Sequence, residues 1–185
     1  MSTTLIIAET EVALSATHFS PRLFQRELGD LRALQQLPAL RSASFTDTLL
    51  DDRGLAQICD VVTIDNLNLQ GTRVTDAGLA HLKKRPDLRH LRLKDNPQLT
   101  DAALVHLTGL MKLESLGVHE TSITLTGLYI LAPLAREGQL RDICIDSFQL
   151  APAGEDEWRA LSLALPGCAI LVKGIGEAVD GQIRR

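Results

Sequence analysis

The sequence predicts an α/β solenoid in which short parallel strands form one face and helices form the other. A phrase that opens as Leu-x-Leu and closes in a helix-like run occurs at Leu67–Leu82 and returns at Leu91–Leu107. Self-similarity at a period of roughly 20 to 50 residues is typical of a stacked array, because one unit cannot bury its apolar face alone. Matching the phrase outward predicts about five repeats of 24 to 27 residues, at 43–66, 67–90, 91–115, 116–142 and 143–167.

The first part of each repeat alternates apolar and polar residues, as LNLQ does at 67–70. Successive side chains of a strand point to opposite faces, so Leu67 and Leu69 are expected to face the core while Asn68 and Gln70 face solvent. The turn that follows carries Thr or Asn, whose side chains can satisfy backbone groups where the chain leaves the strand. These turn positions are Thr48, Thr72, Asn96 and Thr121.

The second part of each repeat has the features of a short helix. Thr75 is expected to be an N-cap, with Asp76 in the first turn, where the helix dipole favours a negative charge. The pair at 51–52, two aspartates, aligns with Thr75 and Asp76 and predicts a similar cap. Leu79 and Leu82 have the three-residue spacing of a helix face that points inward.

Residues 31–172 resemble the leucine-rich repeat family, in its short bacterial variety and its cysteine-containing subtype. The phrase LxLxx(T/C/N)x(V/I)TDxGLxxL recurs in that family, and the match is most specific in repeats 67–90 and 91–115. Repeat 143–167 departs from the pattern, because Ala151–Trp158 reads APAGEDEW in place of TDxGL. The resemblance implies a parallel sheet on the concave face, helices on the convex face, and a role in binding another protein.

The two ends of the chain do not fit the repeat, so we expect a cap segment at 1–30, a repeat domain at 31–174 and a flexible tail at 175–185. Ser20-Pro21 predicts a helix over about 21–28, and Asp30 predicts a second helix that ends at Leu37. Together they would form an irregular helical cap. Thr3–Ala8 could form a strand or not, and the sequence does not decide between the two. CAILV at Cys168–Val172 predicts a strand that closes the array.

Composition indicates one elongated domain, since the chain has 185 residues of which 45% are hydrophobic. No run approaches the roughly 18 apolar residues of a membrane helix, and Met1–Ser15 lacks the positive region of a secretory signal. The odd count of three cysteines favours a reducing compartment, with Cys59 and Cys168 near core positions and Cys144 exposed. We therefore expect a cytoplasmic protein that is a monomer when alone and does not bind membranes.

The motifs that suggest catalysis fail on inspection. LVKGIGEA at Leu171–Ala178 lacks the third glycine of a dinucleotide site, and His119-Glu120 is followed by Ile123 where HExxH needs histidine. His81 and His106 occupy equivalent positions, which we interpret as a solvated outer ridge in preference to a metal site. Nucleic acid is a poor partner for a chain of net charge −4. We predict no catalytic residue, no cofactor and no metal.

The remaining candidate site is the outward face of the strands. His90, Arg92 and Lys94 form a basic row, whereas Asp142 and Asp146 belong to an acidic one. A mixed surface of this kind suits a protein partner with matching charges, although a merely solvated face is the alternative. The predicted partner-binding residues are Asn66, Asn68, Gln70, His90, Arg92, Lys94, Asp95, His119, Glu120, Asp142 and Asp146.

A compact acidic repeat protein without catalytic groups would suit an inhibitor of another protein, such as an immunity protein that masks a toxin. The alternative is an adaptor or effector that bridges two proteins, one held by the repeats and one by segment 1–30. An enzymatic function is the third hypothesis, and it requires that a cluster such as His90, His119 and Asp146 completes a catalytic site.

Overall fold

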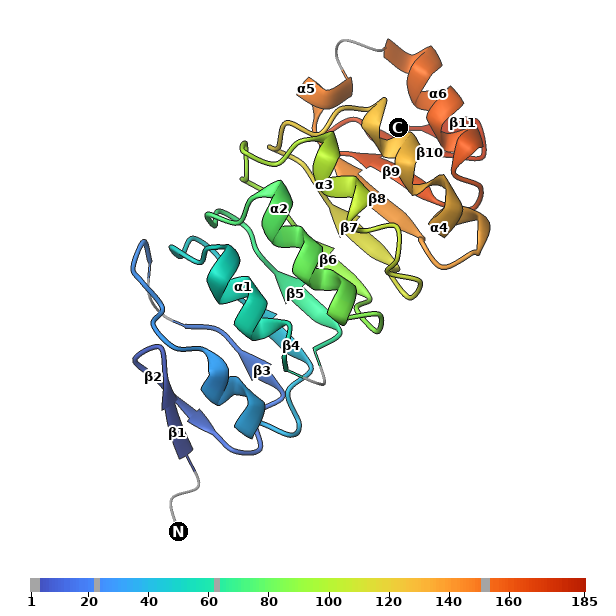
Figure 1. Cartoon of the computed structure of the whole chain (residues 1–185). Helices are drawn as coiled ribbons and strands as arrows, with labels where there is room; N and C mark the ends of the chain where they lie inside the picture. Colours follow the sequence, from blue (N-terminus) through green and yellow to red (C-terminus); the bar gives the residue numbers. More distant parts are fainter. Residues whose placement is uncertain (1–3, 22–23, 62–63, 151–153) are drawn as a thin grey trace.

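A sheet of nine strands runs the length of the molecule (Figure 1), which is a computed structural model that describes residues 4–21, 24–61, 64–150 and 154–185. Within these residues, β3 to β9 are parallel neighbours in chain order, and the last three strands are antiparallel. The strands are β3 (His18–Phe19), β4 (Ser42–Ser44), β5 (Asn66–Asn68), β6 (His90–Arg92), β7 (Ser115–Gly117), β8 (Asp142–Ile145), β9 (Ala169–Val172), β10 (Gly176–Val179) and β11 (Gln182–Arg184).

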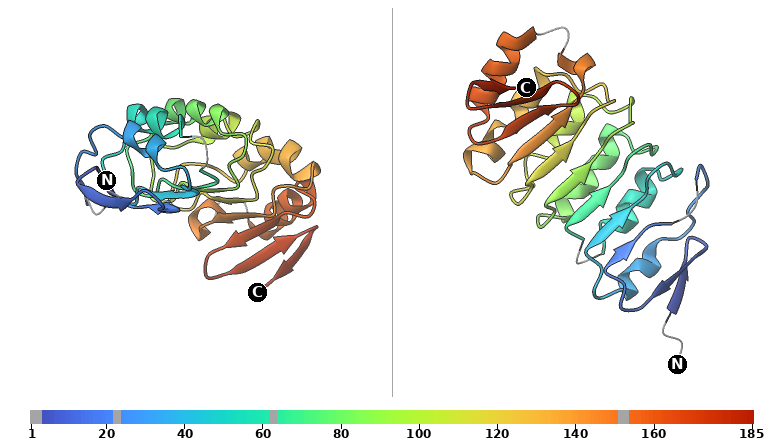
Figure 2. Two further views of the ribbon diagram at one scale, coloured as in Figure 1. Left: turned by 90° about the horizontal axis from the view of Figure 1, so that it is seen from below. Right: turned by 180° about the vertical axis from the view of Figure 1, so that it is seen from behind.

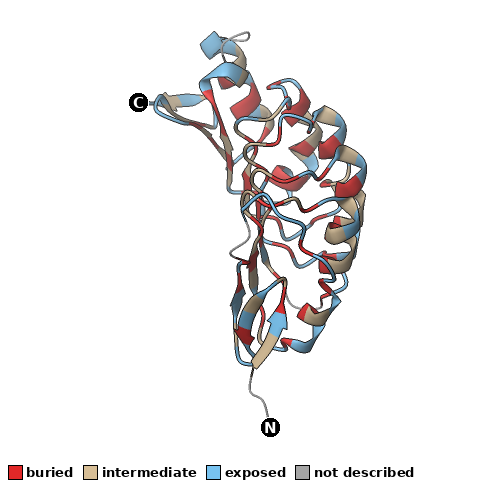
Figure 3. Ribbon diagram, turned by 90° about the vertical axis from the view of Figure 1, so that its left-hand side faces the viewer, coloured by how far each residue is buried: buried red, intermediate tan, exposed pale blue. Residues whose placement is uncertain are grey.

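Short helices cover the outer face, so that the sheet lies on the inner side of the curve (Figures 2 and 3). This arrangement confirms the predicted solenoid with its concave sheet and convex helices. The helices are η1 (Arg32–Gln36), α1 (Asp52–Ile58), α2 (Asp76–Leu79), η2 (Ala80–Lys84), α3 (Asp101–Val105), η3 (Gly127–Leu131), α4 (Ala132–Arg136), α5 (Ser147–Leu150) and α6 (Gly154–Ala164). Of those in the described part of the chain, none has both the length and the apolar character needed to cross a bilayer.

The core is a stack of aliphatic residues, one set from each strand. Leu67, Leu91, Leu116 and Ile143 are paired across β5 to β8, and all four are buried. This register confirms that the first leucine of Leu-x-Leu points inward. Cys59 and Cys168 are buried as expected, and burial raises the pKa of each thiol to about 12. Cys144 is only half-buried.

The N-terminal segment is built mainly from strands, so the predicted helical cap is wrong. Strands β1 (Thr4–Ile7) and β2 (Thr10–Ala13) form a separate antiparallel hairpin, which confirms the strand left open at Thr3–Ala8, although Thr3 lies outside the described residues. The expected helix from Asp30 to Leu37 is present only as the shorter 3₁₀ helix η1, with the Asp30 carboxylate accepting a bond from the main chain of Arg32.

The helix predicted over 21–28 is absent between Phe24 and Leu28, which form a turn and irregular chain, and residues 22–23 lie outside the described residues. Gln25 has a positive φ of 52°, and its main-chain N–H donates to the carbonyl of Asp47 at 2.8 Å. This contact with the turn after β4 outweighs the local helix signals at Ser20-Pro21.

The flexible tail predicted at 175–185 is also wrong, because this segment forms the hairpin of β10 and β11. Val179 pairs with Gln182 across a two-residue loop, in which Asp180 and Gly181 both have positive φ. The loop is held to the end of α6, since the Gly181 N–H donates to the Ser162 hydroxyl at 2.9 Å. The sequence carries a signal for this hairpin, Asp-Gly between alternating residues, that the composition of the tail obscures.

Candidate functional site

The inner face presents two rows of outward side chains that cross the middle strands in register. One row contains Asn66, His90, Ser115 and Asp142, and the next contains Asn68, Arg92, Gly117 and Cys144. A third row, Gln70, Lys94, His119 and Asp146, stands where the strands pass into their turns. The outward orientation of these rows follows from the strand alternation, which buries the apolar residues between them.

The first two rows surround a cavity of about 370 Å³ over strands β5 to β8. Gly117 lies inside it, and the absence of a side chain there leaves open space between Arg92 and Cys144. A Cβ atom at Gly117 would lie 3.7 Å from Cγ of Arg92 and 3.9 Å from Cε1 of His119, which are ordinary contacts. The cavity is lined by Asn66, Asn68, His90, Leu91, Arg92, Ser115, Gly117, His119, Asp142 and Cys144.

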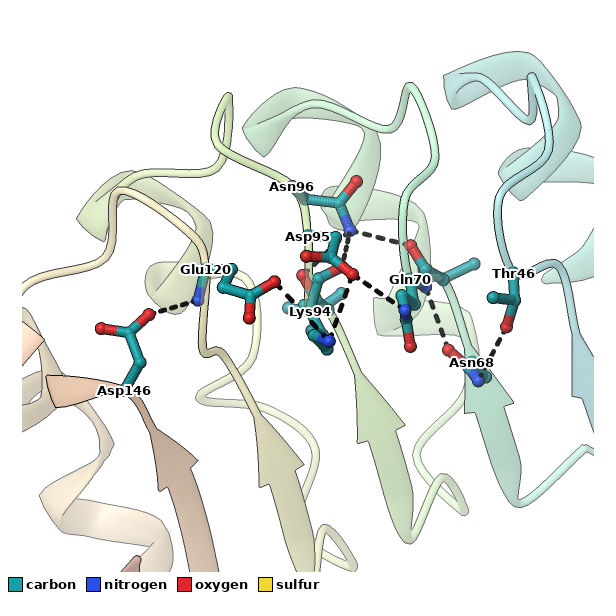
Figure 4. Close-up of polar contacts among 10 residues, drawn as sticks. Thr46, Asn68, Gln70, Lys94, Asp95, Asn96, Glu120 and Asp146 are labelled. Atoms are coloured by element: carbon teal, nitrogen blue, oxygen red, sulfur yellow. Dashed lines mark hydrogen bonds and ion pairs between the residues drawn. The ribbon is translucent and has the colours of Figure 1, made fainter. Parts of the chain in front are cut away.

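Arg92 is the exposed cation of this cavity. Its main-chain carbonyl accepts the Leu69 N–H at 2.8 Å, but its guanidinium makes no hydrogen bond and no ion pair with any residue in the described ranges. Lys94 differs, because its Nζ atom lies 3.4 Å from a carboxylate oxygen of Asp95 and 3.6 Å from one of Glu120 (Figure 4). The charge of Lys94 is therefore balanced within the protein, whereas the guanidinium of Arg92 is available to a ligand.

Asp95 and Gln70 belong to the same polar group at the end of the strands (Figure 4). The side-chain amide of Gln70 donates to Asp95 at 2.8 Å. Asn68 accepts from the main chain of Gln70 and donates to Thr46, both at 3.0 Å. The bonds from Gln70 to Asp95 and from Asn68 to Thr46 join adjacent repeats, so the side chains are held in place before any partner arrives.

Asp146 has a structural role in addition to its position on the face. Its carboxylate accepts main-chain N–H bonds from Glu120 at 2.6 Å and from Gln149 at 2.9 Å, and the residue is only 9% exposed. Two of its lone pairs are thus used to fix the turns after β7 and β8. The predicted acidic row therefore offers mainly Asp142 to a partner, and Asp142 already accepts a bond from the Ser115 hydroxyl at 2.6 Å.

His119 stands at the upper border of the cavity and is half-buried. Its Nδ1 atom is buried and has no hydrogen-bond partner among the described residues. Burial lowers the pKa of the imidazole, and the nearby Lys94 and Lys173 lower it further against the opposing effect of Asp146 and Asp95. The ring is therefore expected to be neutral at pH 7.

The structure brings six of the predicted binding residues to the cavity and leaves five outside it. Those that line the cavity are Asn66, Asn68, His90, Arg92, His119 and Asp142. Gln70, Lys94, Asp95, Glu120 and Asp146 lie beyond it, at the turns. Ser115, Gly117 and Cys144 were missed as site residues, although a glycine at the outward position of LGV, where other repeats have polar side chains, was a signal of open space.

The described residues contain no group of three or more His, Cys, Asp or Glu side chains that could hold a metal ion. His81 and His106 lie on the helical side, at η2 and at the end of α3. His119 and Glu120 follow strand β7 and enter a turn, whereas the two histidines of HExxH need a helix.

Comparison with solved structures identifies the architecture. An internalin (InlF) from Listeria monocytogenes superposes on 88% of this chain and 50% of its own length, with a TM-score of 0.51 and 15% sequence identity. The fold is that of a leucine-rich repeat protein. The leucine-rich repeat-containing protein LegL7 from Legionella pneumophila covers 82% of this chain and 53% of its own, with a TM-score of 0.47 and 16% identity.

The chain spans about half the length of the two solved proteins. No protein-family model matches its sequence, and no curated protein matches it. Leucine-rich repeat proteins generally serve as protein-interaction modules, because the stacked units expose an extended concave surface.

Proposed function

We propose that this chain binds a protein partner on the inner face of strands β5 to β8, with the cavity over Gly117 at the centre of the contact. The observation that carries the proposal is the exposed Arg92, a cation without an intramolecular partner among the described residues, beside an open space in an otherwise ordered polar face. Preorganised polar side chains reduce the entropy that binding must overcome, which favours a specific contact over a merely solvated surface.

The sheet alone is too small for a standard interface, which needs about 800 Å² from each partner. Strands about 4.8 Å apart that each expose a few residues supply only a few hundred Å². We therefore include in the contact the adjoining turns at 71–73, 95–98 and 120–122, together with residues 147–149 of α5. Glu120 and Asp95, which lie outside the cavity, would then contact the partner at its border.

Within this function we favour a cytoplasmic inhibitor, such as an immunity protein that masks a toxin. The net charge of −4 and the mixed inner face support a partner that presents complementary charges. A protein that inhibits another by binding to it needs affinity and a defined orientation. An inner face of fixed side chains can supply both without catalytic groups.

Affinity purification from the source organism tests the binding function. The wild type and an Arg136→Glu variant, altered on the outer helix α4, are expected to recover the same stoichiometric protein. A double variant, Arg92→Glu with Asn66→Arg, changes two exposed inner-face residues and is expected to lose it. Retention of the partner by the folded double variant would move the site away from the inner face.

An adaptor is the second candidate, because the N-terminal segment exposes large apolar side chains, and those of Ile6 and Phe24 are the most exposed of them. Ile6 is 77% exposed and Phe24 is 73% exposed. An adaptor would use them to hold a second protein while the sheet holds the first. Deleting residues 1–30 is a poor test, since it also removes the buried Phe19 and Leu28. An Ile6→Ser, Phe24→Ser variant that loses one recovered protein and keeps another would support this candidate.

A further inference from the structure

The open space over Gly117 belongs to the cavity of about 370 Å³ on the inner face. Gly117 lies between Arg92 on β6 and Cys144 on β8 in the strand register, and adjacent strands are about 4.8 Å apart. The aliphatic stem of Arg92 and the ring of His119 form two of its walls, at 3.7 Å and 3.9 Å from an ideal Cβ position at Gly117. An incoming group would thus pack on carbon while its end approaches the guanidinium.

The charges around this space favour an anion. The cation of Lys94 is balanced by Asp95 and Glu120, and the carboxylate of Asp146 is occupied by two main-chain N–H groups. Burial lowers the pKa of His119, so Arg92 is the cation that lies beside Gly117 in the strand register, and the carboxylate of Asp142 lines the same cavity one strand and one row away. A guanidinium offers a planar pair of N–H donors that matches a carboxylate.

We propose that the pocket over Gly117 receives the carboxylate of an aspartate or glutamate side chain from the partner protein, with Arg92 as its donor. This assignment rests on the proposed binding function. A side chain fits better than a chain terminus, because polar groups lie on both sides of the pocket. Asn66 and Asn68 flank it on β5, and Ser115 and Asp142 flank it on β7 and β8. A partner chain that continues past the pocket can use both sets.

Asp142 gives the proposal a second consequence. Its carboxylate lies in the same cavity, one strand and one row away from Gly117, and accepts the Ser115 hydroxyl. It weakly repels an acidic side chain of the partner that enters the pocket, and it attracts a basic side chain beside that one. A partner that pairs an acidic residue with a nearby basic one therefore suits the face better than a partner with acid alone. Removing the charge of Asp142 should strengthen binding of a probe that carries only an acid.

The test uses the full-length chain and two synthetic peptides, acetyl-Ala-Ala-Glu-Ala-Ala-amide and its Gln counterpart, followed by NMR of the ¹⁵N-labelled protein. The Glu peptide is expected to shift the Arg92 Nε and Gly117 resonances saturably, with a dissociation constant of about 1 mM or weaker, as befits one ion pair. Arg92→Gln and Gly117→Val should each weaken binding about tenfold, the first by removing the donor and the second by filling the space. Asp142→Asn should tighten it by about twofold.

The variants are matched so that misfolding cannot imitate the result. Gly117 lies in a strand with ordinary φ, and valine favours strands, so Gly117→Val is expected to fold, as amide spectra would show. Arg136→Gln on α4 removes a cation elsewhere and should change nothing.

Equal shifts with the Glu and Gln peptides, or no saturable shift at Arg92, would overturn the assignment. So would equal binding by a Gln peptide with a free C-terminal carboxylate, since the ligand would then be a chain terminus. The two proposals can also fail separately. If the Arg92→Glu, Asn66→Arg variant loses the natural partner but the Glu peptide does not bind the wild type, the proposed function stands and only the carboxylate assignment is removed.

Discussion

The carboxylate of Asp76 holds Thr100 of the following repeat through two hydrogen bonds. It accepts the main-chain N–H of Thr100 at 2.9 Å and the hydroxyl at 2.6 Å. The same pair of bonds joins Asp52 to Thr75 on one side and Asp101 to Thr124 on the other. The Thr-Asp phrase therefore has two functions, because the threonine caps its own helix while the aspartate fixes the cap of the next one.

Replacing Asp76 by alanine should lower the free energy of unfolding by about 1 to 2 kcal/mol, since the cap of α3 loses its anchor and an orphaned N–H remains. Urea denaturation followed by circular dichroism measures the change. Asp87→Ala is the control, because the ion pair of Asp87 with Lys112 is exposed and its loss should cost less. Equal losses in the two variants would mean that the ladder between repeats adds nothing to stability.

Asn96 stabilises the fold through its buried side-chain amide, which is 0% exposed. The amide accepts the Thr72 N–H at 3.0 Å and donates to the carbonyls of Leu69 and Leu93 at 2.8 and 2.9 Å. Asn96→Ala leaves the Thr72 N–H and the Leu93 carbonyl without these partners and removes one of the two bonds to the Leu69 carbonyl, so we expect a loss of about 3 kcal/mol in urea denaturation.

Asn96→Thr provides the matched comparison, because threonine stands at the equivalent turns. The Thr72 hydroxyl donates to the carbonyl three residues before it at 2.9 Å, and Thr48 does the same at 2.8 Å. A threonine at position 96 can keep the bond to Leu93 and loses those to the preceding repeat. Its stability should lie between wild type and Asn96→Ala, and a value no better than alanine would contradict the role given to the Leu93 bond.

The parts of the fold that repeat could be predicted from sequence, because each repeat restates the same physical requirement. Leu91 must be buried for the same reason as Leu67, so one register determines the next. The ends follow no such rule. The helix expected near Phe24 gives way to a contact between Gln25 and Asp47, residues far apart in sequence. A local pattern cannot reveal that contact.

The candidate site was predictable in outline and not in detail. Strand alternation placed Arg92 and His119 on the inner face, but alternation gives no information about intramolecular partners. Only the structure distinguishes the unpaired Arg92 from the neutralised Lys94, or gives Asp146 its role in fixing two turns. Gly117 became informative once its neighbours across the sheet were known.

Removing the C-terminal hairpin by ending the chain at Lys173 should expose the edge of β9 and promote association. Strand β10 pairs with β9 and buries Ala178, so its loss leaves unpaired backbone groups and apolar surface together. We expect a lower melting temperature and a mass that rises with concentration in light scattering. A shorter deletion of 182–185 keeps β10 in place and serves as the control. A monomeric, equally stable product of the longer deletion would show that the hairpin is dispensable.

His119 should make stability depend on pH in the mildly acidic range. Burial lowers its folded-state pKa below the ordinary histidine value of about 6.5. The unfolded chain therefore binds more protons than the folded one between the two pKa values, and stability falls as pH falls through that window. Lys94 and Lys173 oppose protonation of the imidazole, whereas Asp146 and Asp95 favour it.

Urea midpoints at about pH 7.5 and about pH 5.5 measure this loss of stability, since the two values bracket ordinary histidine titration. His119→Gln removes the titrating group and should reduce the difference between the midpoints. Asn66→Gln, at an exposed position of the same face and without a titrating group, should leave that difference as in wild type. A half-buried imidazole that resists protonation contributes to the pH dependence of stability only when it is present. If the difference between the two urea midpoints is unchanged in His119→Gln, the pH dependence therefore belongs to other groups.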